Sequence, residues 1–285
     1  MTRPEMWNLG EQTMAASRTA SGRRAAQRLT LAFLVGCGWL LGFGPGASSA
    51  QEQPPVLGRR FSINQDFKPA IDKAVGEVRA RIAAERSQGK LIAYLSFPAG
   101  SADGGPAALR REMADFLKKE LESRYGPDRI WVFVPEMREF ELPRVGNSVP
   151  GSDEYHYFAL HVLAGERSLG EQFDFVYFPR PNDLARFFGA KEGDRLTAIE
   201  RFVERRAGSD PEFKKQVADR PEARREFVAF YGIHVGPASS ASSRDEWNVC
   251  ASINRMRAAS RSMGPDRKLS MYFDGRPVPP PALAQ

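Results

Sequence analysis

Apolar residues along this chain recur with helical spacing in some segments and form short uninterrupted runs in others. In residues 69–87 they lie four, three and four positions apart, which places them on one helix face: Ile71, Val75, Val78 and Ile82. Residues 107–125 and 153–163 show a similar pattern, and we expect a helix in each. A further helix is predicted over residues 244–261, after a loop rich in Gly, Ser, Ala and Pro.

Four short apolar runs predict buried strands between these helices. They are residues 91–97 (LIAYLSF), 130–134 (IWVFV), 173–178 (FDFVYF) and 268–273 (KLSMYF). Strands that alternate with amphipathic helices favour βαβ units, and right-handed crossovers place helices on both faces of the sheet. We therefore expect a Rossmann-like α/β fold with a mostly parallel sheet of about four or five strands.

The remaining segments complete the expected domain organisation. Residues 181–231 are charged and helical, broken at Gly189, Gly208 and Pro221, and predict a helical insertion or a cap over one sheet edge. We expect one α/β domain over residues 66–276. A flexible polar leader (51–65) would precede it, and a Pro-rich tail (277–285) would follow it.

The first fifty residues have the order of a secretory signal peptide. A basic cluster (Arg23, Arg24 and Arg28) is followed by an apolar run of 15 residues (29–43) and by small residues that suit cleavage after Ala50. A helix needs about 20 apolar residues to span a bilayer, so we expect no membrane span in the mature chain. The prediction is export to the periplasm or the medium. Two alternatives stay open: translation from Met1 or Met14, and the general secretory or the twin-arginine route.

Charge and cysteine content narrow the classes of partner. Removing residues 1–50, which hold five Arg and two Glu, lowers the net charge from +6 to about +3. Such a mild positive balance, spread along the chain, disfavours a nucleic-acid partner. Cys250 is the only cysteine left, which excludes an intramolecular disulfide and a Cys-based zinc site.

Ligands of open parallel sheets bind at the carboxyl ends of the strands, and that rule selects four segments: 96–106, 135–150, 179–183 and 274–276. In the first, we select Ser96, Gly104 and Gly105 as ligand-binding candidates, together with Tyr94 inside the strand. Free backbone N–H groups before the helix could hold an anion. A flexible turn at the glycines and core packing of Tyr94 are the alternative interpretations.

The segment 242–248 (SSRDEWN) carries the densest chemistry, at a predicted helix start. Asp245 and Glu246 are catalytic candidates, and Asn248 is a ligand-binding candidate. The positive helix end is expected to keep a carboxylate ionised and fit for a nucleophile or a base. The alternative is a capping box, in which the Ser243 hydroxyl and the Glu246 carboxylate satisfy backbone groups of their own helix.

Asp183 and the pair of His156 and His161 are two further candidate sites. Asp183 follows the third strand and is a catalytic candidate, and capping of the next helix explains it equally well. His156 and His161 are five positions apart and therefore lie on different helix faces, without an HExxH motif. We expect no metal and no cofactor, and a small molecule as the ligand.

The order of these features resembles the nucleoside 2-deoxyribosyltransferase-like group. The resemblance rests on the first strand with YLSFP (94–98), the acidic Asp183 after a strand, and a late helix that opens with acidic residues. It implies a small Rossmann-like fold in which a helix-borne Glu attacks a sugar carbon and an Asp assists the base. By position, Glu246 would be the nucleophile, Asp183 or Asp245 the helper, and Tyr94 would lie near the site.

These features lead to two hypotheses of different class. The first is an exported hydrolase or glycosyl-transfer enzyme that cleaves N-glycosidic bonds with two carboxylates, one as nucleophile and one as acid or base. The alternative is a non-catalytic exported binding protein. The first requires that Glu246 lie near the ends of the first and third strands rather than turn back onto its own helix.

Overall fold

The computed structural model describes residues 50–53, 56–97, 105–191, 193–237, 240–260, 268–273 and 275–278. The predicted signal peptide, except for the backbone of Ala50, lies outside the described residues, and so does Gly104. Within the described part of the chain, no helix has the length and apolar character needed to cross a membrane.

A five-stranded sheet forms the centre of the domain, with the strand order β4-β3-β5-β6-β7. Four strands run parallel: β4 (Ile130–Phe133), β3 (Leu91–Leu95), β5 (Phe175–Phe178) and β6 (Ser270–Phe273). The fifth, β7 (Arg276–Val278), pairs antiparallel with β6 and uses the first residues of the predicted tail. The expected α/β class with a mostly parallel sheet is confirmed.

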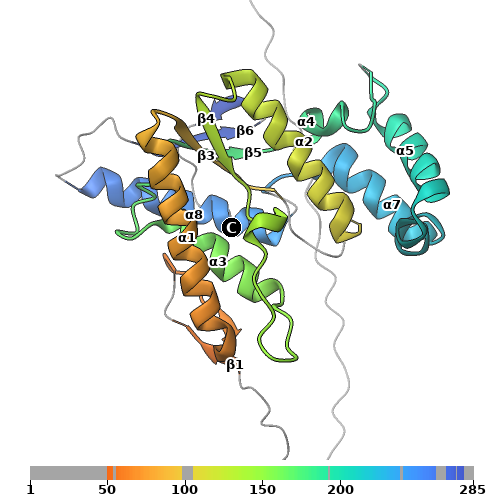
Figure 1. Ribbon diagram of the computed structural model, residues 1–285. Helices are drawn as coiled ribbons and strands as arrows, with labels where there is room; N and C mark the ends of the chain where they lie inside the picture. The colour runs from red at the N-terminus through yellow and green to blue at the C-terminus, as the bar shows by residue number, and fades with distance from the viewer. Residues whose placement is uncertain are drawn as a thin grey trace, which may run out of the picture. The chain divides into compact units, whose positions relative to one another are not determined.

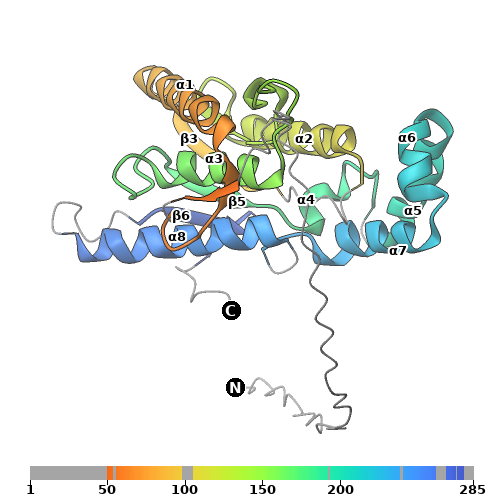
Figure 2. The same ribbon diagram turned by 90° about the horizontal axis from the view of Figure 1, so that it is seen from below.

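Helices cover both faces of this sheet (Figures 1 and 2). Helices α1 (Lys68–Ser87), α3 (Ser152–Ala164) and α8 (Ala241–Ala259) share one hydrophobic core with the side chains of Ile92, Tyr94, Val176 and Phe178. Helix α2 (Ala107–Tyr125) packs on the other face, with Ala93, Leu95, Val132 and Tyr177. Alternate residues of each strand thus serve different cores, as the two-residue period of a strand requires.

The chain reverses its direction of winding at β3. Helix α2 leads from β3 to β4 on one side, and α3 then leads back across β3 to β5 on the other side. The carboxyl ends of β3 and β5 therefore form a topological switch point, the usual place for a ligand in such sheets. Ser96 lies there, and its N–H donates to the carbonyl of Tyr177 at 2.9 Å.

The block 181–231 is helical, as expected, and it extends the core on the α2 face. It contains α4 (Pro181–Ala185), α5 (Arg195–Ser209), α6 (Pro211–Phe213), the π-helix η3 (Lys214–Ala218) and α7 (Pro221–Ala229), and a second π-helix, η4 (Phe230–His234), follows. Phe188, Phe213 and Phe227 from this block pack with the residues of α2. In Figure 1, α5 and α7 lie side by side.

The segment 51–65 differs from the flexible leader that its composition suggests. Strand β1 (Ala50–Glu52) pairs antiparallel with β2 (Ser62–Asn64), and the 3-10 helix η1 (Gln65–Phe67) leads into α1. Phe61 and Ile63 are buried against α3, and the Asn64 N–H donates to Glu154 at 2.8 Å. The alternation of Phe61 and Ile63 supplies the apolar face that holds this hairpin in place. A second 3-10 helix, η2 (Arg138–Phe140), follows β4.

Candidate functional site

Tyr94 and Ser96 point to the same side of β3 and hold the carboxylate of Glu246 from α8. The Tyr94 hydroxyl donates to Oε1 of Glu246 at 2.5 Å, and the Ser96 hydroxyl donates to Oε2. Tyr94 and Ser96 are fully buried, and Glu246 is 3% exposed. The sheet, through one strand, thus binds both oxygens of a carboxylate at the switch point.

The start of α8 explains why Glu246 is free to face the sheet. The helix begins at Ala241, and the N-cap is Ser240, whose hydroxyl accepts from the Ser243 N–H. The capping box of Ser243 and Glu246 is therefore wrong as an interpretation. Glu246 is the sixth residue of the helix, beyond the first turn, and its side chain points to β3 rather than back to its own helix start.

Burial controls the protonation of Glu246. It raises the pKa of this carboxyl to about 7, while the hydrogen bonds from Ser96 and Tyr94 lower the pKa and the charge of Asp245 raises it. The expectation that the helix start keeps Glu246 ionised is therefore wrong, because that effect acts within the first turn and desolvation outweighs it here. A carboxyl with a pKa near 7 can exchange its proton at neutral pH, as acid–base catalysis requires.

Asp245 is adjacent in sequence but faces the N-terminal segment. Its Oδ2 lies 3.0 Å from Nε of Arg59 and 3.8 Å from Nε2 of His156. The burial of His156 lowers the pKa of its imidazole, and the charge of Asp245 opposes this effect. Among the described residues, no three His, Cys, Asp or Glu side chains are grouped as a metal ion would require.

Asp183 lies on the other face of the sheet. Its Oδ1 accepts from the Tyr177 hydroxyl at 2.6 Å, and its Oδ2 accepts from the Arg180 N–H at 2.8 Å, which caps α4. Tyr177 belongs to the α2-side core, whereas Glu246 is bound by residues on the α8 side. The carboxylate instead borders a cavity of about 220 Å³ with Arg124 and Arg186. We therefore leave Asp183 out of the site around Glu246.

The candidates Asn248 and Gly105 lie in surroundings that differ from those of Glu246. Asn248 is partly buried in α8, two positions after Glu246, and therefore lies on a different helix face. Gly105 has φ +71°, and a Cβ there would meet the ring of Phe227 at 3.2 Å. Gly105 thus permits a left-handed turn in close contact with α7, just before α2 begins.

Glu136 is a member of this region that the sequence analysis did not single out. It follows β4 in a turn within the selected segment 135–150, and its Oε2 is buried with no hydrogen-bond partner among the described residues. Burial, with the nearby charge of Glu246, raises the pKa of Glu136 well above its usual range, and its own backbone N–H and Arg110 oppose this effect. Its place directly after the second strand is the sequence signal that could have found it.

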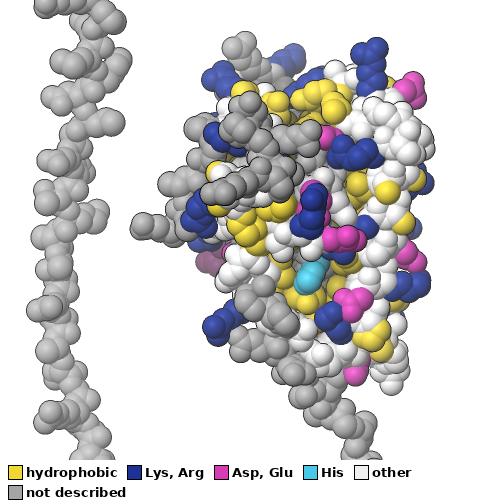
Figure 3. All heavy atoms as spheres, turned by 90° about the vertical axis from the view of Figure 1, so that its left-hand side faces the viewer, with side chains coloured by type: hydrophobic (Ala, Val, Ile, Leu, Met, Phe, Trp, Pro, Cys, Tyr) yellow, Lys and Arg dark blue, Asp and Glu magenta, His cyan; other side chains and the backbone are white. Residues whose placement is uncertain are grey.

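The surface shows charged side chains of both signs. On the face in Figure 3, Lys and Arg side chains are interspersed with Asp and Glu and with hydrophobic groups.

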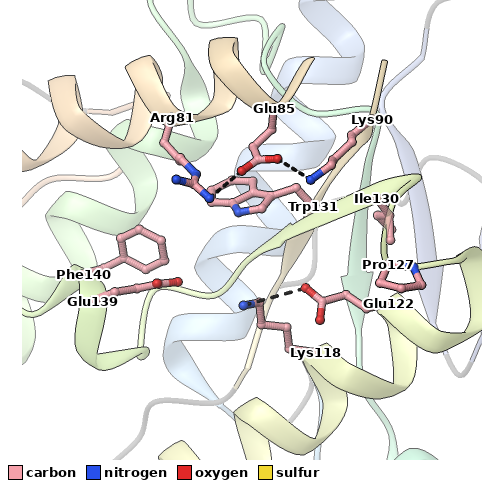
Figure 4. Close-up of a pocket in the computed structure, with 10 residues that line it drawn as sticks. All are labelled: Arg81, Glu85, Lys90, Lys118, Glu122, Pro127, Ile130, Trp131, Glu139 and Phe140. Carbon is pink, nitrogen blue, oxygen red and sulfur yellow. Dashed lines mark hydrogen bonds and ion pairs between the residues drawn. The ribbon is translucent and has the colours of Figure 1, made fainter. Parts of the chain in front are cut away.

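A separate cavity of about 440 Å³ lies along β4, the edge strand of the sheet (Figure 4). Glu85 in its wall pairs with Lys90 at 2.7 Å and with Arg81 at 2.6 Å, and Trp131 and Phe140 also line it. None of the candidate site residues lines this cavity.

Comparison of the chain with protein-family models, with curated proteins and with solved structures found no match. The likeness to the nucleoside 2-deoxyribosyltransferase-like group therefore stays a prediction from the sequence.

Proposed function

We propose that this protein is an exported enzyme that cleaves or transfers N-glycosidic bonds, with Glu246 as the nucleophile. The observation that carries the proposal is the binding of both Glu246 oxygens by Tyr94 and Ser96 at the carboxyl end of β3. A buried carboxyl with a perturbed pKa at a switch point is the kind of group that active sites use. The same network fixes the direction of the carboxylate, which favours attack at one defined position.

The reaction needs an ionised Glu246 and a separate acid. A Glu246 oxygen attacks the anomeric carbon of the sugar, a C–O bond forms, and the C–N bond breaks with its electron pair on the leaving nitrogen. The acid gives this nitrogen a proton. Water, or another acceptor that carries a proton, then displaces Glu246 from the sugar and returns a proton to the acid.

The substrate class comes from the resemblance of the chain to nucleoside 2-deoxyribosyltransferase-like proteins. In that arrangement a helix-borne Glu attacks the sugar carbon, and by its position in the sequence Glu246 would match this residue. We therefore propose nucleosides or related N-glycosides as substrates. Action outside the cytoplasm follows from the signal peptide predicted in residues 1–50.

Turnover of a panel of ribo- and deoxyribonucleosides tests the proposal. Wild type should release free base, and Glu246→Gln should lose at least about 100-fold in kcat because the attacking carboxylate is gone. Glu85→Gln is the matched control, since Glu85 is also 3% exposed but pairs with Lys90 and Arg81 beside the β4 cavity. Absence of release by wild type, or full activity of Glu246→Gln, would contradict the proposal.

A non-catalytic binding protein is the second candidate, and one observation favours it. Glu246 is 3% exposed and both of its oxygens already accept hydrogen bonds, which is also how a buried structural carboxylate is satisfied. A structural role predicts that Glu246→Gln changes stability while wild type turns over no nucleoside.

A further inference from the structure

We propose that Glu136 is the acid of the Glu246 site and gives its proton to the leaving nitrogen of the substrate. This inference rests on the proposed function and assigns the role for which the sequence suggested Asp183 or Asp245. Asp183 is bound on the other face of the sheet, and Asp245 is paired with Arg59.

The strand register brings Glu136 and Ser96 to the same edge of the sheet. Tyr94 of β3 pairs with Phe133 of β4 at the end of the parallel ladder, and Ser96 and Glu136 follow this pair by two and three residues on their own strands' continuations. Neighbouring strands lie about 4.8 Å apart. Glu136 therefore leaves the sheet at the same edge as the Ser96 hydroxyl that binds Glu246.

The surroundings of Glu136 favour its protonated form. Its Oε2 is buried and has no hydrogen-bond partner among the described residues, so ionisation of Glu136 carries a desolvation cost that its own backbone N–H and Arg110 offset only in part. A protonated oxygen in the same place would present an O–H to an acceptor from outside. The leaving nitrogen of an N-glycoside is such an acceptor.

The charged and titratable groups that act on Glu136 come from three elements. Glu246 of α8 and Tyr94 of β3 interact with it electrostatically, and Arg110 of α2 favours its ionised form. The Arg110 guanidinium also donates to the Gly105 carbonyl. Burial and the charge of Glu246 raise the pKa of Glu136, and they outweigh the hydrogen bond from its own backbone N–H and the charge of Arg110, which lower it.

A protonated Glu136 beside an ionised Glu246 supplies both groups that the reaction requires. At neutral pH and above, Glu246 attacks the anomeric carbon while Glu136 transfers its proton to the nitrogen, which leaves as N–H with the electrons of the broken C–N bond. Water attacks the sugar ester in the second step, gives one proton to the Glu136 carboxylate and releases Glu246. Sugar and free base are the net products, and both carboxyls return to their starting forms.

Leaving-group dependence tests this assignment. Glu136→Gln should lower turnover of ordinary nucleosides by at least about 100-fold, because their nitrogen must be protonated to leave. With p-nitrophenyl glycosides, whose leaving group needs no proton, release of the first nitrophenolate by the variant should fall less than about tenfold. Glu246→Gln should lose activity on both substrates. Equal losses on both substrates for Glu136→Gln would overturn the acid role.

Infrared spectroscopy separates this inference from the proposed function, because it needs no turnover. At pH 8 the infrared spectrum of wild type should show the carbonyl band of a protonated carboxylic acid. This band should be missing from the spectrum of Glu136→Gln. Circular dichroism checks that the variant is folded, and Glu136→Ala provides a second variant if it is not. Persistence of the whole band in the folded variant would overturn the inference even if nucleosides were substrates. Loss of the band without any turnover would show that Glu136 is the protonated group, and it would contradict the proposed enzymatic function instead.

Discussion

The Tyr94 hydroxyl donates to the Glu246 carboxylate at 2.5 Å, across 152 positions of the sequence. This bond joins the strand at the switch point to the helix that precedes β6, and the hydroxyl of Ser96, the residue that follows β3, repeats the link. Both donors lower the pKa of Glu246 against the opposing effect of burial. The protonation of Glu246 therefore depends on β3 as much as on its own helix.

Tyr94→Phe should raise the pKa of Glu246, because it removes a hydrogen bond that favours the ionised form. The alkaline pH region in which Glu246 is ionised should begin at a higher pH than in wild type, and stability at pH 8 should fall by about 1–3 kcal/mol. A ¹³C NMR titration of labelled glutamate carboxyls measures the first effect. Tyr177→Phe is the matched control, since the Tyr177 hydroxyl binds Asp183 on the other face. Equal titration of Glu246 in Tyr94→Phe and wild type would contradict the account.

The raised pKa of Glu246 makes stability depend on pH. The folded chain holds this proton up to about pH 7, whereas the ordinary pKa of the group is 4.5. The resulting stabilisation is fully present below about pH 4.5 and is lost as the pH rises through about 7, with a total of about 3 kcal/mol. Urea unfolding of wild type between pH 4.5 and 8 should show this decline. Glu246→Gln should reduce the decline by about 3 kcal/mol, and the part that arises from the raised pKa of Glu136 should remain.

Glu85→Gln serves as the control for that pH dependence. The hydrogen bond from Lys90 holds the pKa of Glu85 below its usual range, so its stabilising effect is lost at acid pH instead. The decline between pH 4.5 and 8 should therefore persist in this variant. If Glu246→Gln retains the full decline as well, another group is responsible for it.

Helix α8 offers a test of how its start is specified. Ser240→Ala removes the N-cap side chain and should destabilise the chain by up to about 1 kcal/mol, since the hydrogen bond it makes is long, 3.5 Å. Ser243→Ala should cost less than Ser240→Ala, because the Ser243 hydroxyl is buried with no hydrogen-bond partner among the described residues. Thermal unfolding of the two variants measures the difference. A larger loss for Ser243→Ala would restore the capping box predicted from the sequence.

The turn before α2 should not tolerate a side chain. Gly105 has a positive φ, and a Cβ there would meet Phe227, so Gly105→Ala should destabilise by at least about 1 kcal/mol. Gly76→Ala is the matched control inside α1, where an added Cβ meets nothing within 4 Å. The free energy of unfolding of Gly76→Ala should rise by about 0.5–1 kcal/mol, because Ala has a higher helix propensity than Gly. Equal effects of the two substitutions in urea unfolding would contradict this view of Gly105.

Local patterns predicted the main helices and the four parallel strands, because their signals are local, but not the strands β1, β2 and β7. The segment 107–125 is helical over its full predicted length, and each predicted strand of the sheet is present within two residues at either end. Helix α8 begins three residues early, because several serines in the preceding loop can act as an N-cap and the sequence does not distinguish Ser240 from the others.

The site was predictable only in part. The rule for strand ends led to Ser96 and to the segment that contains Glu136, and the helix start led to Glu246. The sequence did not reveal which face of the sheet each side chain would take, so Asp183 was grouped with Glu246 although Tyr177 holds it on the α2 side. Glu136 escaped notice because its relation to Ser96 arises from the strand register.

Covalent trapping tests the role of Glu246 most directly. A 2-deoxy-2-fluoro sugar with an activated leaving group forms glycosyl esters that hydrolyse slowly, and mass spectrometry of the digested protein locates the modified residue. The account predicts one added sugar on Glu246 in wild type and none in Glu246→Gln, with labelling of Glu85→Gln unchanged. A sugar on a different residue, or no adduct in a wild type that cleaves nucleosides, would contradict the nucleophilic role of Glu246.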